Sequence, residues 1–299
     1  MRILRSVWLA LVICVLGAAP SRAVLIATGD GTGNVTAPVD DPGFANVGTR
    51  TTGFTVLYLG SGWVLTANHV GAGDVILAGQ TYVAMPYSEV RLRNQDGTNA
   101  DLLLFKLLLW PQIPNLVIAS QTPGVGTVAT LIGNGADRGA ATVWNSIAGY
   151  SWGTRNTIRW GTAPVEEQAV NVSLAGSVTR AFTTLFKRRA TPSPAQAAVG
   201  DSGGAVFVKV NGVWNLAGVM VAVDTYMGQP ASTSLYGNHT FAADLTTYRE
   251  QIVSTIMPPP SCGLGFELAF VLPPLARLRA RRRSPPLGAG SPPWRSTSG

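Results

Sequence analysis

The chain has 299 residues, a formal net charge of +7 and a pI near 9.8. The excess positive charge belongs to the two ends, because residues 24–260 carry 13 Lys and Arg against 14 Asp and Glu. A central region whose charges nearly cancel lacks the basic footprint of a nucleic-acid-binding protein. We therefore expect no nucleic-acid partner.

The first 23 residues have the pattern of a secretory signal peptide. Arg2 and Arg5 precede an apolar run over residues 7–19, and small residues lead up to a cleavage site after Ala23. The run is well short of the roughly 20 residues that a membrane-spanning helix needs, which argues against an uncleaved anchor. We expect export, to the outside of the cell or to its envelope (periplasm or outer surface).

The two cysteines do not predict a disulfide in the mature body. Cys14 lies in the apolar run and lacks the small neighbours of a lipoprotein cysteine, and Cys262 lies near the C-terminus. The region between them is long enough to bury a sizeable core without a disulfide.

Turn-forming residues dominate residues 24–50, and short apolar, β-branched runs follow them. The lengths of these runs and the Gly, Asn and Asp between them predict strands joined by hairpins. The predicted strands are 53–59, 62–66, 74–77, 102–109, 127–132, 205–210 and 213–223. Asn211-Gly212, between the last two, is a strong signal for a two-residue hairpin turn.

A helical period appears near the end of the chain, over residues 242–256, and prolines 258–260 end it. The sequence thus predicts a signal peptide (1–23), an all-β domain with one C-terminal helix (24–257), and a tail of different composition (258–299).

Three stretches carry the side chains that acyl transfer to a serine requires: a nucleophile, an imidazole base and a carboxylate that orients the base. His69 follows the predicted strand 62–66, and Asp101 directly precedes the strand 102–109. Ser202 lies in the segment Gly-Asp-Ser-Gly-Gly, where glycines allow a tight turn close to a substrate carbonyl. Taken singly, each also fits an ordinary histidine, a strand-capping aspartate or a glycine-rich loop.

Together, the Leu-Thr-Ala-Asn-His segment ending at His69, the Asp101 strand and the Gly-Asp-Ser-Gly-Gly motif closely resemble the trypsin-like (chymotrypsin-fold) serine proteases. The resemblance runs from about residue 53 to residue 256. It implies two six-stranded antiparallel β-barrels with the active site between them, followed by a helix. It implies Ser202 as nucleophile, His69 as base and then acid, Asp101 as orienting carboxylate, and the N–H groups of Gly200 and Ser202 as oxyanion hole.

The chain is then an exported serine endopeptidase that acts on a protein or peptide through an acyl-enzyme and needs no cofactor or metal. The alternative is an inactive pseudoprotease that uses the fold as a binding module. Such relatives usually lose a triad residue or a regular serine loop, and this sequence keeps both.

The sequence departs from the family around the substrate pocket. Val70 stands where many animal members have a disulfide cysteine, which points to a bacterial-type relative. By ungapped counting, Val221-Ala222-Val223 replaces the usual Ser-Trp-Gly substrate-binding segment. Val223 thus replaces the glycine that normally leaves the pocket open, which predicts either a narrow pocket or a different mode of substrate binding. Gln196 would lie near the pocket floor, where an uncharged residue argues against a preference for Lys or Arg.

Asp201 raises the question of activation. In the family this aspartate often pairs with a newly freed N-terminal amine, and signal cleavage would create such an amine at Val24. The alternative is that Asp201 is satisfied by local hydrogen bonds.

The tail combines a short motif around Cys262, an apolar segment from residue 266 and five Arg over residues 277–283. It resembles the C-terminal sorting signals of some exported bacterial proteins, which implies membrane contact and a sorting or processing enzyme that acts near Cys262. The alternative is a disordered basic tail, since the apolar segment is short and contains Glu267 and two prolines.

Overall fold

The computed structural model describes residues 24–154 and 157–257. The predicted signal peptide and tail, with Cys14 and Cys262, lie outside these residues and stay predictions. Within the described part, no helix is long and apolar enough to cross a membrane.

The N-terminal half is one antiparallel sheet whose central strand is buried along its whole length. In spatial order its strands are β6 (Gln80–Tyr82), β5 (Val75–Leu77), β2 (Val47–Arg50), β3 (Thr55–Gly60), β4 (Trp63–Thr66), β8 (Asn99–Lys106) and β7 (Val90–Arg93). A single turn of 3-10 helix, η1 (Phe44–Asn46), precedes β2. The sheet has seven strands, one more than predicted, because the hairpin β5–β6 adds a short edge strand.

The C-terminal half is the predicted closed six-stranded barrel. Around the barrel its strands are β12 (Arg159–Leu174), β13 (Ser177–Leu185), β18 (His239–Asp244), β16 (Val213–Val223), β15 (Ala205–Val210) and β9 (Val128–Gly133). The hairpin predicted at Asn211-Gly212 is confirmed: Val210 pairs with Val213, and both turn residues have the positive φ that a type I′ turn requires.

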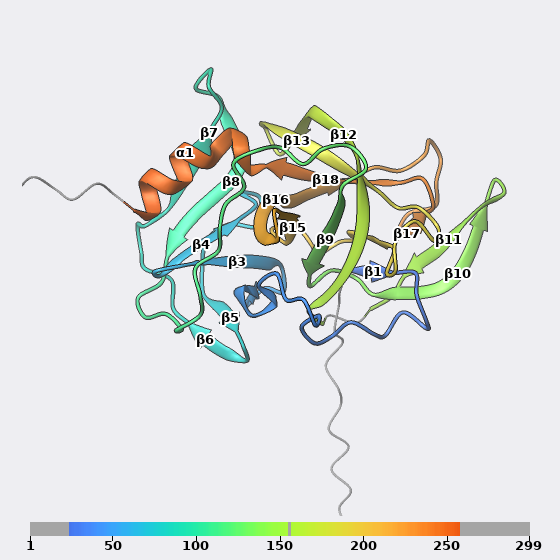
Figure 1. Cartoon of the computed structure of the whole chain (residues 1–299), viewed down its shortest axis with the longest axis horizontal. Helices are drawn as coiled ribbons and strands as arrows, with labels where there is room; N and C mark the ends of the chain where they lie inside the picture. Colours follow the sequence, from blue (N-terminus) through green and yellow to red (C-terminus); the bar gives the residue numbers. More distant parts are fainter. Residues whose placement is uncertain (1–23, 155–156, 258–299) are drawn as a thin grey trace, which may run out of the picture. The chain divides into compact units, whose positions relative to one another are not determined.

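Two small sheets, which the sequence did not predict, flank the barrel (Figure 1). One joins β10 (Arg138–Trp144), β11 (Ile147–Trp152) and β17 (Thr233–Leu235), and we call it the accessory sheet. The other pairs β1 (Leu25–Ile26), within a segment predicted to be irregular, with β14 (Ala195–Gln196), which directly precedes the serine loop.

The C-terminal helix α1 (Leu245–Ile256) begins three residues later than predicted. Residues 242–244 complete β18, and Asp244 then caps the helix by accepting a hydrogen bond from the Thr246 N–H. Tyr248 and Ile252 are buried, and Gln251 is hydrogen-bonded to both backbone groups of Arg93 on β7, so α1 packs against the N-terminal half (Figure 1).

One apolar cluster joins the two halves and the helix. It includes Leu57 and Leu65 from the N-terminal sheet, Phe207 and Leu216 from the barrel, and Tyr248 from α1. Because the predicted catalytic residues come from both halves, this shared core holds them in a common frame.

We expect Phe207→Ala to lower the free energy of unfolding by about 3–5 kcal/mol, because it opens a cavity in this shared core. Urea denaturation measures the change. Val210→Ala, at an exposed position of the same strand, is the control and should change stability by less than about 0.5 kcal/mol. Equal losses in the two variants would contradict a core that couples the halves through Phe207.

Candidate active site

His69 and Asp101 are brought together by the neighbouring strands β4 and β8. His69 follows β4, and Asp101 is the third residue of β8, whose pairing places Leu103 opposite Thr66. The His69 Nδ1 atom lies 2.6 Å from Asp101 Oδ2, and the His69 backbone N–H donates to Asp101 Oδ1 over 2.9 Å. The Asp101 side chain is 1% exposed and the His69 side chain 21% exposed. A buried carboxylate therefore fixes the ring and leaves Nε2 as the nitrogen that is free to act.

Thr179 fixes the backbone of Asp101 from the other half of the molecule. The Asp101 N–H donates to Thr179 Oγ1 over 2.8 Å, and Thr179 is buried on β13 of the barrel. The aspartate thus lies where the two halves meet.

The chain holds its other histidine in the same way. His239 Nδ1 lies 2.7 Å from Asp224 Oδ2, and the His239 N–H donates to Asp224 Oδ1 over 2.5 Å. This pair joins the start of β18 to the residue after β16, and neither residue lines the cavity beside Ser202. The two pairs differ in burial, because the Asp224 side chain is 38% exposed whereas Asp101 is buried, so of the two histidines His69 is the one held by a buried carboxylate.

The loop that carries Ser202 is tied to the N-terminal sheet through Gly200. The Gly200 carbonyl accepts hydrogen bonds from the Thr55 N–H (3.2 Å) and hydroxyl (2.9 Å), and Thr55 Oγ1 in turn accepts from the Asn134 N–H. Gly203 has a φ of +86°, and a Cβ there would lie 2.1 Å from the Thr55 carbonyl oxygen. The close approach of the loop to β3 therefore requires glycine.

The backbone N–H groups of Gly200 and Ser202 have no hydrogen-bond acceptor within the described part of the chain, whereas the N–H groups of Asp201, Gly203 and Gly204 all have one. The two N–H groups predicted to form the oxyanion hole are thus available to donate hydrogen bonds to a substrate. The Ser202 side chain is partly exposed. In the part of the chain that the structure describes, the Ser202 hydroxyl makes no hydrogen bond to His69.

Asp201, the residue of this loop directly before Ser202, is fully buried. Its carboxylate accepts hydrogen bonds from the Gly135 N–H (2.6 Å) and the Ala198 N–H (2.8 Å). Burial raises the pKa of Asp201 to about 7, although these two hydrogen bonds and the attraction of Arg159 lower it. A Cβ at Gly133 or Gly135 would lie 2.1 Å from a carboxylate oxygen, so both positions must be glycine for the carboxylate to fit.

A cavity of about 270 Å³ adjoins Ser202, and its walls are mostly apolar. The lining residues are Trp152, Ala197, Ala198, Val199, Ser202, Met220, Val221, Ala222 and Val223. The predicted pocket residues Val221 and Val223 are among them. Gln196 is not: it is buried one residue before the lining begins, and its Nε2 donates to the His239 carbonyl over 3.4 Å.

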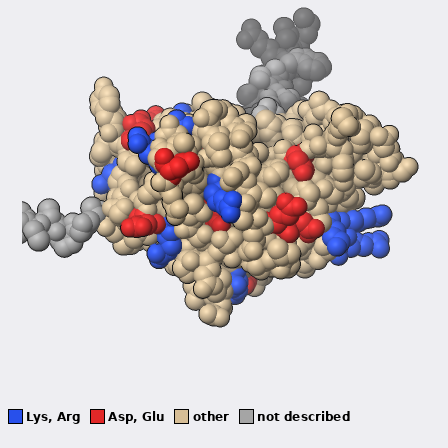
Figure 2. Space-filling model, turned by 90° about the horizontal axis from the view of Figure 1, so that it is seen from above, with Lys and Arg blue, Asp and Glu red and all other residues tan. Residues whose placement is uncertain are grey.

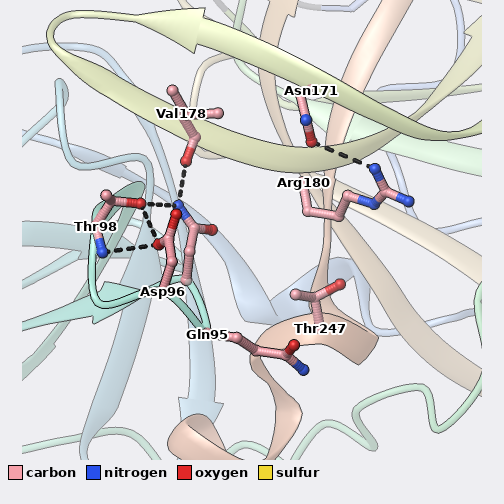
Figure 3. A pocket seen from close by; sticks show the side chains of 8 residues that line it. Gln95, Asp96, Thr98, Asn171, Val178, Arg180 and Thr247 are labelled. Carbon is pink, nitrogen blue, oxygen red and sulfur yellow. Dashed lines mark hydrogen bonds between the residues drawn. The ribbon is translucent and has the colours of Figure 1, made fainter.

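A second, more polar cavity of about 550 Å³ lies between β13 and the turn that joins β7 to β8 (Figure 3). Val178 and Arg180 line it, whereas Thr179 between them faces the aspartate, as side-chain alternation along a strand requires. Its polar groups largely satisfy one another: Thr98 donates to Asp96, and Arg180 to Asn171. Because these polar groups bond one another, the cavity gives no indication of a ligand.

Sequence reasoning missed four residues that support the site: Thr55, Asn134, Thr179 and Trp152. Asn134 lies between two glycines directly after the predicted strand 127–132, which signals a turn but no function. Thr179 and Trp152 carried no signal, because neither β13 nor β11 was predicted and their roles depend on contacts with distant segments.

Several solved structures with a similar fold are distant from this chain in sequence. A mutant of human heparin binding protein (CAP37) has a TM-score of 0.50 at 16% identity, with 74% of this chain and 95% of that chain covered. The Ser343Ala mutant of Rv3671c from M. tuberculosis H37Rv has a TM-score of 0.46 at 18% identity and coverage of 75% and 94%. The HtrA-type protease AlgW with a decapeptide has a TM-score of 0.43 at 21% identity and coverage of 69% and 52%.

No curated protein matches the sequence. The match to the trypsin family, in contrast, spans residues 44–248 and therefore both halves of the fold, from η1 into α1. It includes the histidine–aspartate pair, the serine loop and the cavity beside it. Because this match covers more than half of the chain, the chain belongs to the trypsin family.

Proposed function

We propose that the protein is an exported serine endopeptidase that cleaves peptide bonds through an acyl-enzyme intermediate. The observation that carries the proposal is the buried Asp101, which holds the Nδ1 side of His69 and leaves Nε2 free. The family supports peptidase chemistry on a protein or peptide substrate. Export rests on the signal-peptide pattern of residues 1–23.

In the proposed reaction, His69 Nε2 takes the proton of Ser202 as its hydroxyl oxygen attacks the substrate carbonyl. The N–H groups of Gly200 and Ser202 stabilise the negative oxygen of the tetrahedral intermediate. His69 then gives its proton to the departing amine, which leaves an ester on Ser202. Water, deprotonated by His69, hydrolyses this ester and frees the serine.

The cavity beside Ser202 supports cleavage after an apolar residue. Its wall includes Ala197, Met220, Val221, Val223 and Trp152, and none of the lining residues that the structure describes is charged. A Lys, Arg, Asp or Glu side chain would lose its hydration there without gaining a partner. A small or medium apolar side chain would bury its surface without that penalty.

Asp201 supports a role for the mature N-terminus. Val24 is buried in the same apolar cluster as Ala197 and Met220, two residues that line the cavity, and β1 directly after it pairs with β14. Cleavage after Ala23 would create a positively charged amine at Val24. Such an amine would favour the ionised form of Asp201, which burial disfavours, and would thereby order the serine loop.

We expect Ser202→Ala to abolish labelling by a fluorophosphonate probe. We expect Asp101→Asn to lower kcat by roughly 10⁴-fold, because the ring of His69 loses the carboxylate that sets its tautomer. Asp224→Asn is the matched control, because it alters the carboxylate that bonds the ring and backbone N–H of the other histidine, outside the cavity. Its kcat should change by less than about tenfold. Labelling that persists without Ser202, or no labelling of correctly folded protein, would refute the protease and favour a binding module.

We expect a peptide library to show cleavage after small and medium apolar residues. Val223→Gly should then shift the ratio of kcat/KM toward aromatic residues by roughly tenfold or more, since it removes a branched side chain from the wall. Val213→Gly, an exposed position on the same strand, controls for the effect of glycine on β16. An unchanged profile in Val223→Gly would show that this cavity does not receive the side chain before the cleaved bond.

We expect a protein that begins at Val24 to be active and one with a single extra residue before Val24 to be inactive. The pH dependence of the free energy of unfolding should report the same contact between the Val24 amine and Asp201. Without a nearby amine, the raised pKa of Asp201 means that the free energy of unfolding falls as pH rises from about 4 to about 7, by about 1.4 kcal/mol for each pH unit. This fall should be smaller in the protein that begins at Val24 and absent in Asp201→Asn.

Full activity of the extended protein would contradict activation by the amine. It would mean that the hydrogen bonds from Gly135 and Ala198 suffice to order Asp201.

A further inference from the structure

Three consecutive cations project from the turn between β13 and β14. Lys187, Arg188 and Arg189 are all exposed, and within the described residues no ion pair joins any of them to an acidic side chain. Without these three residues, residues 24–260 carry 10 Lys and Arg against 14 Asp and Glu, so this turn is a local concentration of positive charge on an otherwise acidic domain. Figure 2 shows basic side chains projecting together from the end of the body at which β10 and β11 lie in Figure 1.

The turn is held firmly in place. Phe186, directly before it, is buried and stacks on Tyr236 with ring centroids 4.6 Å apart. The Phe186 N–H donates to the Asn238 carbonyl, and the Gly237 N–H donates to the Phe186 carbonyl. A further hydrogen bond from the Ala190 N–H to the Lys187 carbonyl closes the turn. The three cations therefore start from a fixed backbone.

Arg188 borders a cavity of about 310 Å³ on the accessory sheet. The cavity is lined by Ala141, Thr142, Val143, Ala148, Gly149, Tyr150, Arg188 and Tyr236. Val143 is 70% exposed, and the hydroxyls of Tyr150 and Tyr236 lie 3.4 Å apart. The lining combines small apolar side chains, two phenol groups and one guanidinium, and none of its described residues carries a carboxylate.

This cavity and the one beside Ser202 share a strand. Tyr150 lines the first and Trp152 the second, and residues two apart on a strand point to the same face. Both side chains reach toward β17, where Trp152 bonds Ser234 within the strand and Tyr150 bonds Tyr236 directly after it. The two residues are about 7 Å apart along β11, so a few residues of extended peptide can connect the two cavities.

We propose that the turn 187–189 and the cavity bordered by Arg188 form a secondary site that binds an acidic segment of the protein substrate. The inference rests on the proposed protease function and names a substrate class for it. A carboxylate would pair with the unpaired cations, and a neighbouring apolar side chain would cover Val143 and the alanines. That apolar floor favours a peptide over a sulfated polysaccharide, which needs cations but no apolar contact.

The kinetic test uses two peptides that share one cleavable apolar core and differ in a flanking run of four Glu or four Gln, placed on either side of the core at several spacings. For wild-type protein we expect kcat/KM to be about 3–10-fold higher for the best Glu peptide, mainly through KM, and the ratio to fall at high salt. Arg188→Ala and the double variant Lys187→Ala/Arg189→Ala should bring the ratio close to one.

Arg93→Ala is the matched control, because Arg93 is also exposed but lies on β7 of the N-terminal sheet. It should preserve the ratio. A ratio near one in wild-type protein, or an equal loss in Arg93→Ala, would overturn the proposal.

A binding test separates this site from catalysis. A fluorescein-labelled peptide with four Glu should bind the full mature Ser202→Ala protein, as measured by fluorescence anisotropy, and should bind several-fold more weakly after Arg188→Glu is added. If wild-type protein cleaves neither peptide but this binding is observed, the protease function fails and the acidic-peptide site stands. If heparin binds and the Glu peptide does not, the proposal is wrong.

Discussion

The burial of Asp101 is the constraint on which the active-site arrangement depends. A carboxylate that is 1% exposed needs hydrogen-bond donors, and His69 supplies two of them, from its backbone and its ring. Thr179 binds the aspartate backbone from the opposite half. Satisfying one buried charge therefore sets the ring orientation of His69 and places the pair at the junction of the sheet and the barrel.

The serine loop obeys a similar requirement through a second buried carboxylate. Asp201 is held by backbone N–H groups from its own loop and from the turn after β9, and glycine at positions 133 and 135 lets it come close. The Gly200 carbonyl is tied to Thr55 at the start of β3. Hydrogen bonds within the protein thus hold both the Asp201 carboxylate and the Gly200 carbonyl. The N–H groups of Gly200 and Ser202 have no acceptor among the described residues and are free to bind a substrate.

The accessory sheet contributes to the walls of two cavities. It places Trp152 on the wall of the cavity beside Ser202, and Tyr150 on the wall of the cavity bordered by Arg188, together with Tyr236 directly after β17. The candidate catalytic residues His69, Asp101 and Ser202 lie outside this sheet. Under the proposed function, substrate recognition would therefore involve an element that carries none of the candidate catalytic residues.

The sequence by itself determined the local β structure around the serine motif and named the candidate catalytic residues. His69, Asp101 and Ser202 stand in short motifs, and the predicted strands 205–210 and 213–223 coincide with β15 and β16, because apolar, β-branched runs and an Asn-Gly turn are local signals. Tertiary structure alone decided β12, β13 and the accessory sheet. β12 contains Gly161, Pro164 and two adjacent glutamates, which disfavour a strand locally, and it forms because β9 and β13 supply its hydrogen-bond partners. The support from Thr179 and the placement of Trp152 follow from such long-range pairing, which no local pattern encodes.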